Sequence, residues 1–137
     1  MTNNVILIAD DEPWQRMWMT QMLHTAGWTC STVTDGSDVV GQALALQPTL
    51  LILDMEMPSV GGLEAAQQVR MLPKTQHIPI LFVTSYTNGP ALLKNTPFER
   101  AELLIKPFHP DELLRRVRRR LGADEAEQSA PTTSTGK

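Results

Sequence analysis

Leu50-Leu51-Ile52-Leu53-Asp54 is the stretch that decides the fold, because four apolar residues run without a break into one carboxylate. A short apolar run of this kind is typical of a strand that is buried on both faces of a parallel sheet. Val5–Ala9 has the same character, as do residues 78–83 and 103–105, and residues 28–33 form a weaker candidate. The sequence therefore predicts five strands, with Asp35-Gly36 as the turn after the second strand.

Helical patterns lie between these strands. In the first pattern Pro13 suits an initial helical position, Met19 and Leu23 follow at helical spacing, and Gly27 ends the run. Similar patterns occupy residues 37–46, 61–72 and 111–121. The alternation predicts βαβ units and a parallel sheet covered by helices on both faces. Because crossovers are right-handed, the favoured architecture is a doubly wound α/β fold.

The stretch before the last strand departs from this regularity. Pro90 and Pro97 bracket only residues 91–96, so a helix there should be short or irregular. After Gly122 the composition changes to Ala, Glu, Ser, Thr and Pro without apolar periodicity. We therefore expect one domain over residues 1–122 and a disordered tail over residues 123–137.

Composition narrows the class of protein. The chain has 137 residues, of which 42% are apolar, and a net charge of −3, so it has no overall electrostatic attraction to nucleic acid or membranes. The single Cys30 cannot form an internal disulfide, and Met1 is followed by no signal-like segment. No apolar run is long enough to span a membrane. A cytoplasmic protein is the expectation.

Polar residues stand where the predicted strands end. They are Asp10 and Asp11 after the first strand, Asp54 at the third, Thr84 and Ser85 at the fourth, and Lys106 at the fifth. Ligands gather beyond the carboxyl ends of strands in an open parallel sheet, so these side chains should converge. Clustered carboxylates suit Mg²⁺, and a carboxylate held there can attack phosphorus. A lone aspartate after a strand is most often a cap, so the case depends on the four strand ends together.

This ordered set resembles the receiver signature of bacterial two-component systems. It comprises Asp10-Asp11, then Leu53-Asp54-Met55-Glu56-Met57-Pro58 with Gly61-Gly62 beyond, then Thr84-Ser85, then Lys106-Pro107-Phe108. The intervals also match, and the resemblance covers roughly residues 4–122. It implies a flavodoxin-like (βα)5 fold with strand order 2-1-3-4-5. It also implies a signalling module, not an enzyme, that receives a phosphoryl group from a histidine kinase or a histidine phosphotransfer protein.

The resemblance implies a role for each acidic residue. Asp54 corresponds to the phosphoacceptor. Asp11 and Asp54 would bind Mg²⁺ directly, and Asp10 would bind it mainly through water. The backbone carbonyl of Glu56 would be a further ligand.

The resemblance also assigns roles on the fourth and fifth strands. Lys106 would contact the phosphoryl oxygens, and its peptide bond to Pro107 would be cis. Thr84 would move to bond the phosphate, and the small Ser85 would leave room for it. Leu103 departs from the family, which usually has Tyr, Phe or His three residues before the lysine. This leucine is either a plain packing choice or a sign of altered switching.

Other features point to other functions less strongly. Five arginines crowd the last helix, at positions 115, 116, 118, 119 and 120. A solvated face or a protein-docking surface is favoured over nucleic-acid binding, because the domain is negatively charged overall. His24, His77 and His109 lack the spacing of metal ligands.

Two enzymatic or carrier alternatives are weighed against signalling. A phosphatase of the haloacid dehalogenase class needs a second aspartate two residues after the first, where this chain has Glu56. A flavodoxin-like FMN carrier needs a phosphate-binding loop after the first strand, where Asp10, Asp11 and Glu12 would repel phosphate. We expect no output domain after residue 122, so a stand-alone receiver and a piece of a larger regulator or hybrid kinase both stay open. The kinase, the stimulus and the output are not specified by the sequence.

Overall fold

The computed structural model describes residues 4–122, in which strands and helices alternate. The strands are β1 (Val5–Ala9), β2 (Thr29–Val33), β3 (Leu50–Asp54), β4 (Ile80–Thr84) and β5 (Glu102–Ile105). The α-helices are α1 (Pro13–Thr25), α2 (Val39–Leu46), α3 (Gly62–Arg70), α4 (Gly89–Leu93) and α5 (Pro110–Val117). A 3₁₀ turn over Gly36–Asp38 precedes α2, and a π-helical turn over Arg118–Gly122 follows α5. The predicted tail, residues 123–137, lies outside the described residues.

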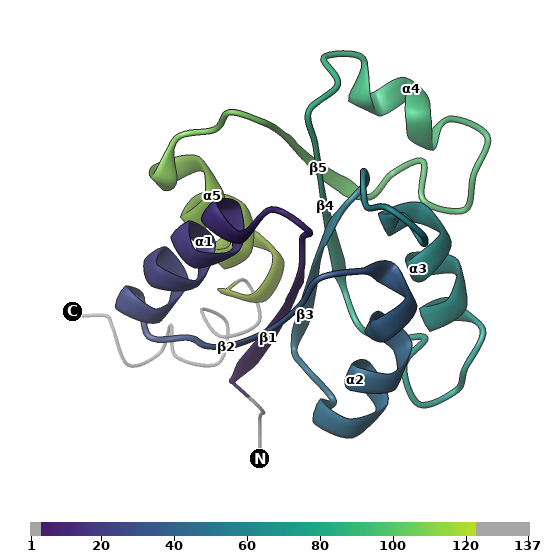
Figure 1. Cartoon of the computed structure of the whole chain (residues 1–137), viewed down its shortest axis with the longest axis horizontal. Coiled ribbons are helices and arrows are strands. Elements are labelled where there is room, and N and C mark those ends of the chain that lie inside the picture. Colours follow the sequence, from purple (N-terminus) through teal and green to yellow (C-terminus); the bar gives the residue numbers. More distant parts are fainter. Residues whose placement is uncertain (1–3, 123–137) are drawn as a thin grey trace.

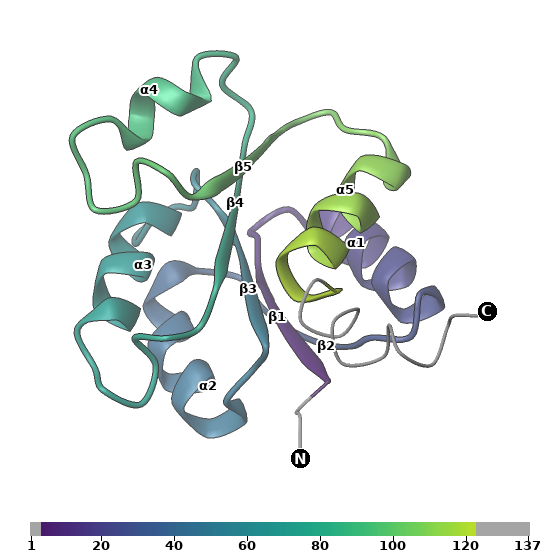
Figure 2. The same ribbon diagram turned by 180° about the vertical axis from the view of Figure 1, so that it is seen from behind.

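All strand pairs in the described sheet are parallel, and their order is β2-β1-β3-β4-β5. The predicted doubly wound fold and strand order are therefore confirmed. Helices α1 and α5 cover one face of the sheet, and α2 and α3 cover the other (Figure 1). The view from behind shows the same two layers with β1 and β3 between them (Figure 2).

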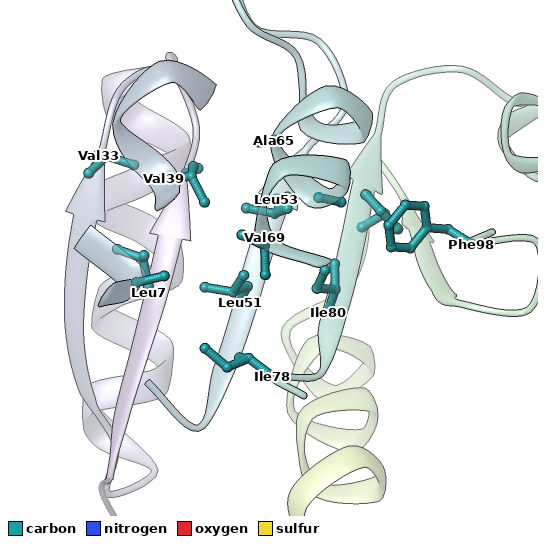
Figure 3. Close-up of a cluster of buried hydrophobic side chains, with 14 of the residues drawn as sticks. Leu7, Val33, Val39, Leu51, Leu53, Ala65, Val69, Ile78, Ile80 and Phe98 are labelled. Carbon is teal, nitrogen blue, oxygen red and sulfur yellow. The ribbon is translucent and has the colours of Figure 1, made fainter. Parts of the chain in front are cut away.

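The central strands β1, β3 and β4 are buried on both faces, because successive side chains point to opposite sides and helices cover each side of the sheet. Within β3, Leu51 and Leu53 face α2 and α3, whereas Leu50 and Ile52 face α1 and α5. The first group belongs to a cluster that we call the α2–α3 core (Figure 3). The second belongs to a cluster that we call the α1–α5 core. Every residue of β3 is buried, including Asp54 at its end.

The buried and half-buried tryptophans lie on the α1–α5 side. The rings of Trp18 and Phe108 lie 5.4 Å apart, and Trp28 is buried in the α1–α5 core. Trp14, in the first turn of α1, is 65% exposed. Helix α1 begins at Pro13 and ends before Gly27, whose φ of 104° is a conformation that favours glycine.

Some helix ends differ from the sequence-based expectation. Helix α3 ends at Arg70 rather than near residue 72, because the chain turns toward Pro73 and the buried Thr75 hydroxyl donates to the Val69 carbonyl at 2.7 Å. The pattern predicted from residue 37 becomes α-helical only at Val39. In the last helix, α geometry gives way to a π turn after Val117.

The expectation for the fourth helix is confirmed. Helix α4 has only five residues, with Pro90 in its first turn. It lies beside β5 and contributes Leu93 to the α2–α3 core. Among residues 4–122, no helix combines the length and the apolar character needed to cross a bilayer.

Candidate functional site

Four strands bring their polar end residues to one edge of the sheet. Asp10 follows β1, Asp54 ends β3, Thr84 ends β4 and Lys106 follows β5. The Lys106 ammonium lies 3.2 Å from Asp54 Oδ2 and 3.4 Å from Asp10 Oδ2. Residues separated by up to 96 positions in the chain thus meet at this edge.

Three carboxylates form the acidic part of the site. Ligand oxygens of Asp10, Asp11 and Asp54 all lie within 4.8 Å of one another. Asp10 is fully buried and Asp54 is 3% exposed, whereas Asp11 is open to solvent. Hard oxygen donors with one open side match the preferences of Mg²⁺, which takes few carboxylates and keeps several waters. The donor set therefore fits that cation.

Backbone amides fix the two buried carboxylates. Asp10 Oδ1 accepts a hydrogen bond from the Glu12 N–H at 2.9 Å, and Asp54 Oδ1 accepts one from the Glu56 N–H at 3.0 Å. Each carboxylate therefore presents one oxygen to the loop that follows its strand and the other to Lys106. This division of partners holds both side chains in defined orientations before any ligand arrives.

Opposing influences of the surroundings determine the pKa of Asp54. Desolvation raises the pKa of Asp54 to about 7, and the nearby Asp10 carboxylate adds to the rise. The Glu56 amide and the Lys106 ammonium act in the opposite direction. For Lys106, burial alone would lower the pKa, but the two carboxylates outweigh it and raise the pKa of the ammonium. The lysine therefore stays charged and offsets part of the repulsion between the two aspartates.

The segment after β5 positions this lysine. The Lys106 backbone N–H donates to the Thr84 carbonyl at 2.7 Å, which joins the ends of β4 and β5. The Lys106–Pro107 peptide bond is cis, as the family resemblance implies.

The residues predicted to act as a switch lie at the end of β4 and within β5. Thr84 is fully buried, and its hydroxyl donates to the Glu56 carboxylate. The Ser85 backbone N–H donates to the other oxygen of the same carboxylate at 2.9 Å. Leu103 is partly buried and packs against the α2–α3 core. Sequence reasoning did not reveal the engagement of Glu56 with Thr84.

Asp35 is a further positioning residue that the sequence indicated only as part of a turn. Its carboxylate accepts hydrogen bonds from the backbone N–H groups of Ser37, Ser59 and Val60 and from the Ser59 hydroxyl. These bonds hold the pKa of Asp35 well below its usual range. The loop before α2 is thereby tied to the loop that follows β3. The adjacent Gly36 has no room for a side chain, because a Cβ there would collide with the Val60 carbonyl oxygen.

Comparison with known proteins agrees with this geometry. The model of the response regulator receiver domain matches residues 6–118. The chain is 30% identical over 122 residues to the DNA-binding response regulator MtrA of Mycolicibacterium smegmatis, a match that covers 89% of this chain and 52% of MtrA. The chain spans about half the length of the curated relatives that it matches first.

Two solved structures are similar over their whole length. Chemotaxis protein CheY4 of Vibrio cholerae has a TM-score of 0.79 and 28% identity, covering 88% of this chain and 100% of CheY4. Response regulator TrrA of Thermotoga maritima, solved in complex with Mg²⁺ and beryllofluoride, has a TM-score of 0.77 and 30% identity. That match covers 86% of this chain and 99% of TrrA.

Proposed function

The chain belongs to the response-regulator receiver family, and on that premise we propose that Asp54 is the residue that accepts a phosphoryl group. Receiver domains are phosphoacceptor signalling modules of two-component systems rather than enzymes in the ordinary sense. The match to the receiver family therefore argues against the phosphatase and the FMN-carrier alternatives. We keep residues 1–122 as the proposed extent of the receiver.

The observation that carries the proposal is the environment of the Asp54 carboxylate. It lies at the end of the fully buried strand β3, with Lys106 Nζ 3.2 Å from Oδ2 and the carboxylates of Asp10 and Asp11 beside it. A carboxylate that is fixed and nearly dry can act as a nucleophile toward phosphorus. The ammonium of Lys106 is placed to stabilise negative charge on the oxygens of the incoming group.

The proposed metal ligands are those implied by the family. Asp11 and Asp54 would bind Mg²⁺ directly, Asp10 would bind it mainly through water, and the backbone carbonyl of Glu56 would complete the protein ligands. When bound, Mg²⁺ would neutralise charge on the phosphoryl oxygens and on the carboxylates. The hydrogen bond from the Glu56 N–H to Asp54 supports this assignment, since it holds the ligand-bearing loop at the site.

The proposed reaction is a transfer between two side chains. An oxygen of Asp54 forms a bond to phosphorus while the bond between phosphorus and a histidine nitrogen of the donor breaks. The electron pair of that bond stays on the imidazole, which takes up a proton. Lys106 binds the phosphoryl oxygens during the transfer, and Thr84 moves to hydrogen-bond one of them afterwards. Ser85 leaves space for that movement.

The proposed donor is a histidine kinase or a histidine phosphotransfer protein. Among the arginines of the last helix, Arg116 is paired with Glu102 and Glu112, and Arg119 with Glu102. Arg115, Arg118 and Arg120 are exposed and available to a protein partner. The name of MtrA records DNA binding by that protein, of which this chain matches about half. The absence of a nucleic-acid partner, and a cytoplasmic location, stay predictions for this chain.

Intact-mass spectrometry after incubation with acetyl phosphate or phosphoramidate tests the proposal. With Mg²⁺, the wild-type protein should gain one phosphoryl adduct. The adduct should be absent from Asp54→Asn and from wild-type protein treated with a chelator. An undiminished adduct in Asp54→Asn would show that another residue is the acceptor.

The ligand assignment has its own test. Titration with Mg²⁺ should show weaker binding to Asp11→Ala than to the wild type. Glu64→Gln is a matched control, because Glu64 is an exposed carboxylate on α3 outside the site. Equal Mg²⁺ affinity in the wild type and Asp11→Ala would contradict the assignment of Asp11.

A further inference from the structure

The Glu56 carboxylate accepts hydrogen bonds from the Thr84 hydroxyl and the Ser85 backbone N–H, at the start of the loop between β4 and α4. Its Oε2 accepts a hydrogen bond from Thr84 Oγ1, and the two oxygens are 2.5 Å apart. Its Oε1 accepts the Ser85 backbone N–H at 2.9 Å. Since Thr84 is fully buried and Glu56 is partly buried, water competes little for the bond between them. A glutamate that follows β3 thus fixes the end of β4.

The Thr84 hydroxyl has only one proton to donate. In this structure that proton is directed at Glu56, while the hydroxyl oxygen accepts the Tyr86 backbone N–H at 3.2 Å. A phosphoryl oxygen on Asp54 would need the same proton. Thr84 therefore cannot donate to Glu56 and to a phosphoryl group at the same time.

We propose that Glu56 is a latch that competes with the phosphoryl group for Thr84 and so opposes the switched state. The proposal rests on the proposed function of Asp54. In the latched state Thr84 and Ser85 are bonded to Glu56. In the released state Thr84 bonds the phosphoryl group, and the negative charge of that group repels the Glu56 carboxylate. Both effects favour release once Asp54 is modified.

Release of Thr84 would change the packing of α4, because the two are in direct contact. A Cβ at Gly89 would lie 2.8 Å from Thr84 Cγ2 and 2.7 Å from Leu103 Cδ2, so the first turn of α4 rests closely on both side chains. Displacement of Thr84 toward Asp54 would remove one of these two supports. The latch therefore connects the acidic site to the position of α4, and Leu103 takes part by packing rather than through a polar group.

Calorimetric titration with beryllofluoride in excess Mg²⁺ measures the latch. Glu56→Ala should bind beryllofluoride about tenfold more tightly than the wild type, a change equivalent to about 1.4 kcal/mol. Glu56→Gln should fall between them, because its amide oxygen still accepts from Thr84 but forms a weaker, uncharged hydrogen bond. Glu64→Gln, which removes a carboxylate from the exposed face of α3, should bind as the wild type does.

A double-mutant cycle separates the latch from simple charge repulsion. In a Thr84→Val background the effect of Glu56→Ala should shrink to less than about twofold, because the competing hydroxyl is gone. The effect in the wild-type background should persist at high salt, since a partly buried hydrogen bond is screened little. An equal effect of Glu56→Ala with and without the hydroxyl would overturn the latch.

The ligand-free protein offers a readout that does not depend on binding. The Ser85 amide and the Thr84 methyl should shift in NMR spectra of Glu56→Gln, and unchanged signals would also overturn the latch. Wild-type protein that binds beryllofluoride as tightly as Glu56→Ala does would refute the latch while leaving the function of Asp54 intact. Wild-type protein that binds no beryllofluoride would instead refute the proposed function, and the latch with it.

Discussion

Helices α4 and α5 both lie next to β5, but they are held in opposite ways. Helix α5 has eight residues, and Leu113 and Val117 anchor it in the α1–α5 core. Arg116 donates to the Glu102 carboxylate at 2.9 Å and to the Leu103 carbonyl at 3.1 Å, which fastens the helix to the neighbouring strand. The helix is thus held over residues 113–117.

Helix α4 is held mainly at the two ends of its segment. It has five residues and no side-chain hydrogen bond at its N-terminus. At one end Gly89 rests on the Thr84 methyl, and past the other end Phe98 packs edge-on against Phe82 with ring centroids 5.6 Å apart. Between them, the buried side chain of Leu93 packs into the α2–α3 core. The comparison teaches that a change at the site can move α4 while α5 serves as a fixed frame.

Truncation of Phe98, which packs beyond the end of α4, or of Leu113, which anchors α5, should give the largest effect on the free energy of unfolding. Phe98→Ala should lower the free energy of unfolding by about 3–4 kcal/mol, and Leu113→Ala by about 2–4 kcal/mol, since both side chains are buried. Denaturant unfolding measures both values. Hydrogen exchange should distinguish them, with Phe98→Ala accelerating exchange mainly within residues 88–98. Uniform acceleration in both variants would break the comparison.

A change of pH acts on the acidic site at the carboxyl ends of the strands. Because burial raises the pKa of Asp54 to about 7, the folded protein binds more protons than the unfolded chain between about pH 4 and pH 7. Without Mg²⁺ the free energy of unfolding should therefore fall as pH rises through this range. The fall should be on the order of 2 kcal/mol, because Asp54 interacts with charged neighbours and does not titrate as an isolated carboxyl. Urea unfolding at several pH values measures it.

Two variants serve as controls for this pH dependence. Asp54→Asn should remove the fall between pH 4 and pH 7. Asp35→Asn should leave it in place and act at lower pH, because the lowered pKa of Asp35 gives stability that is lost only in acid. NMR signals of residues 84–93 should follow the Asp54 titration while those of residues 110–117 stay still. The reverse pattern would identify α5 as the responsive helix.

Addition of a single methyl group at the start of α4 should give the smallest effect on the free energy of unfolding. Gly89→Ala should lower stability by about 1–2 kcal/mol, because the added Cβ would collide with Thr84 and Leu103. Gly41→Ala is the matched control, since a Cβ there meets nothing within 4 Å and alanine favours helix α2 by about 0.5–1 kcal/mol. Thermal unfolding measures both. Two substitutions with the same sign would contradict the close contact of α4 with Thr84.

The sequence predicted the central strands well because β1, β3 and β4 are buried on both faces. Val5–Ala9 forms β1 as predicted, and the run from Leu50 ends at Asp54. The site followed from the same pattern, since residues at the carboxyl ends of parallel strands must share one edge. Lys106 thus lies beside Asp10 and Asp54 as predicted.

The details that the sequence did not reveal depend on partners distant in the chain. Glu56 lies in the loop after β3, and its orientation depends on a hydrogen bond from Thr84, 28 residues later in the chain. Asp35 was recognised as a turn residue, but its bonds to Ser59 require two loops to meet. The early end of α3 depends on a hydroxyl from Thr75 beyond the helix. Periodicity describes a segment and contains no information on such contacts.

The tryptophans and the tyrosine lie in different parts of the molecule. Two of the three tryptophans, Trp18 and Trp28, pack on the α1–α5 side, and Trp14 is exposed on the first turn of α1, three residues after Asp11. The one tyrosine, Tyr86, lies in the loop that leads to α4 and is 54% exposed. Indole emission should therefore report cation binding near Asp10 and Asp11 and changes in packing on the α1–α5 side. The ring protons of Tyr86 should report the approach to α4 in NMR spectra, so the unlabelled protein carries separate signals for cation binding and for the switch.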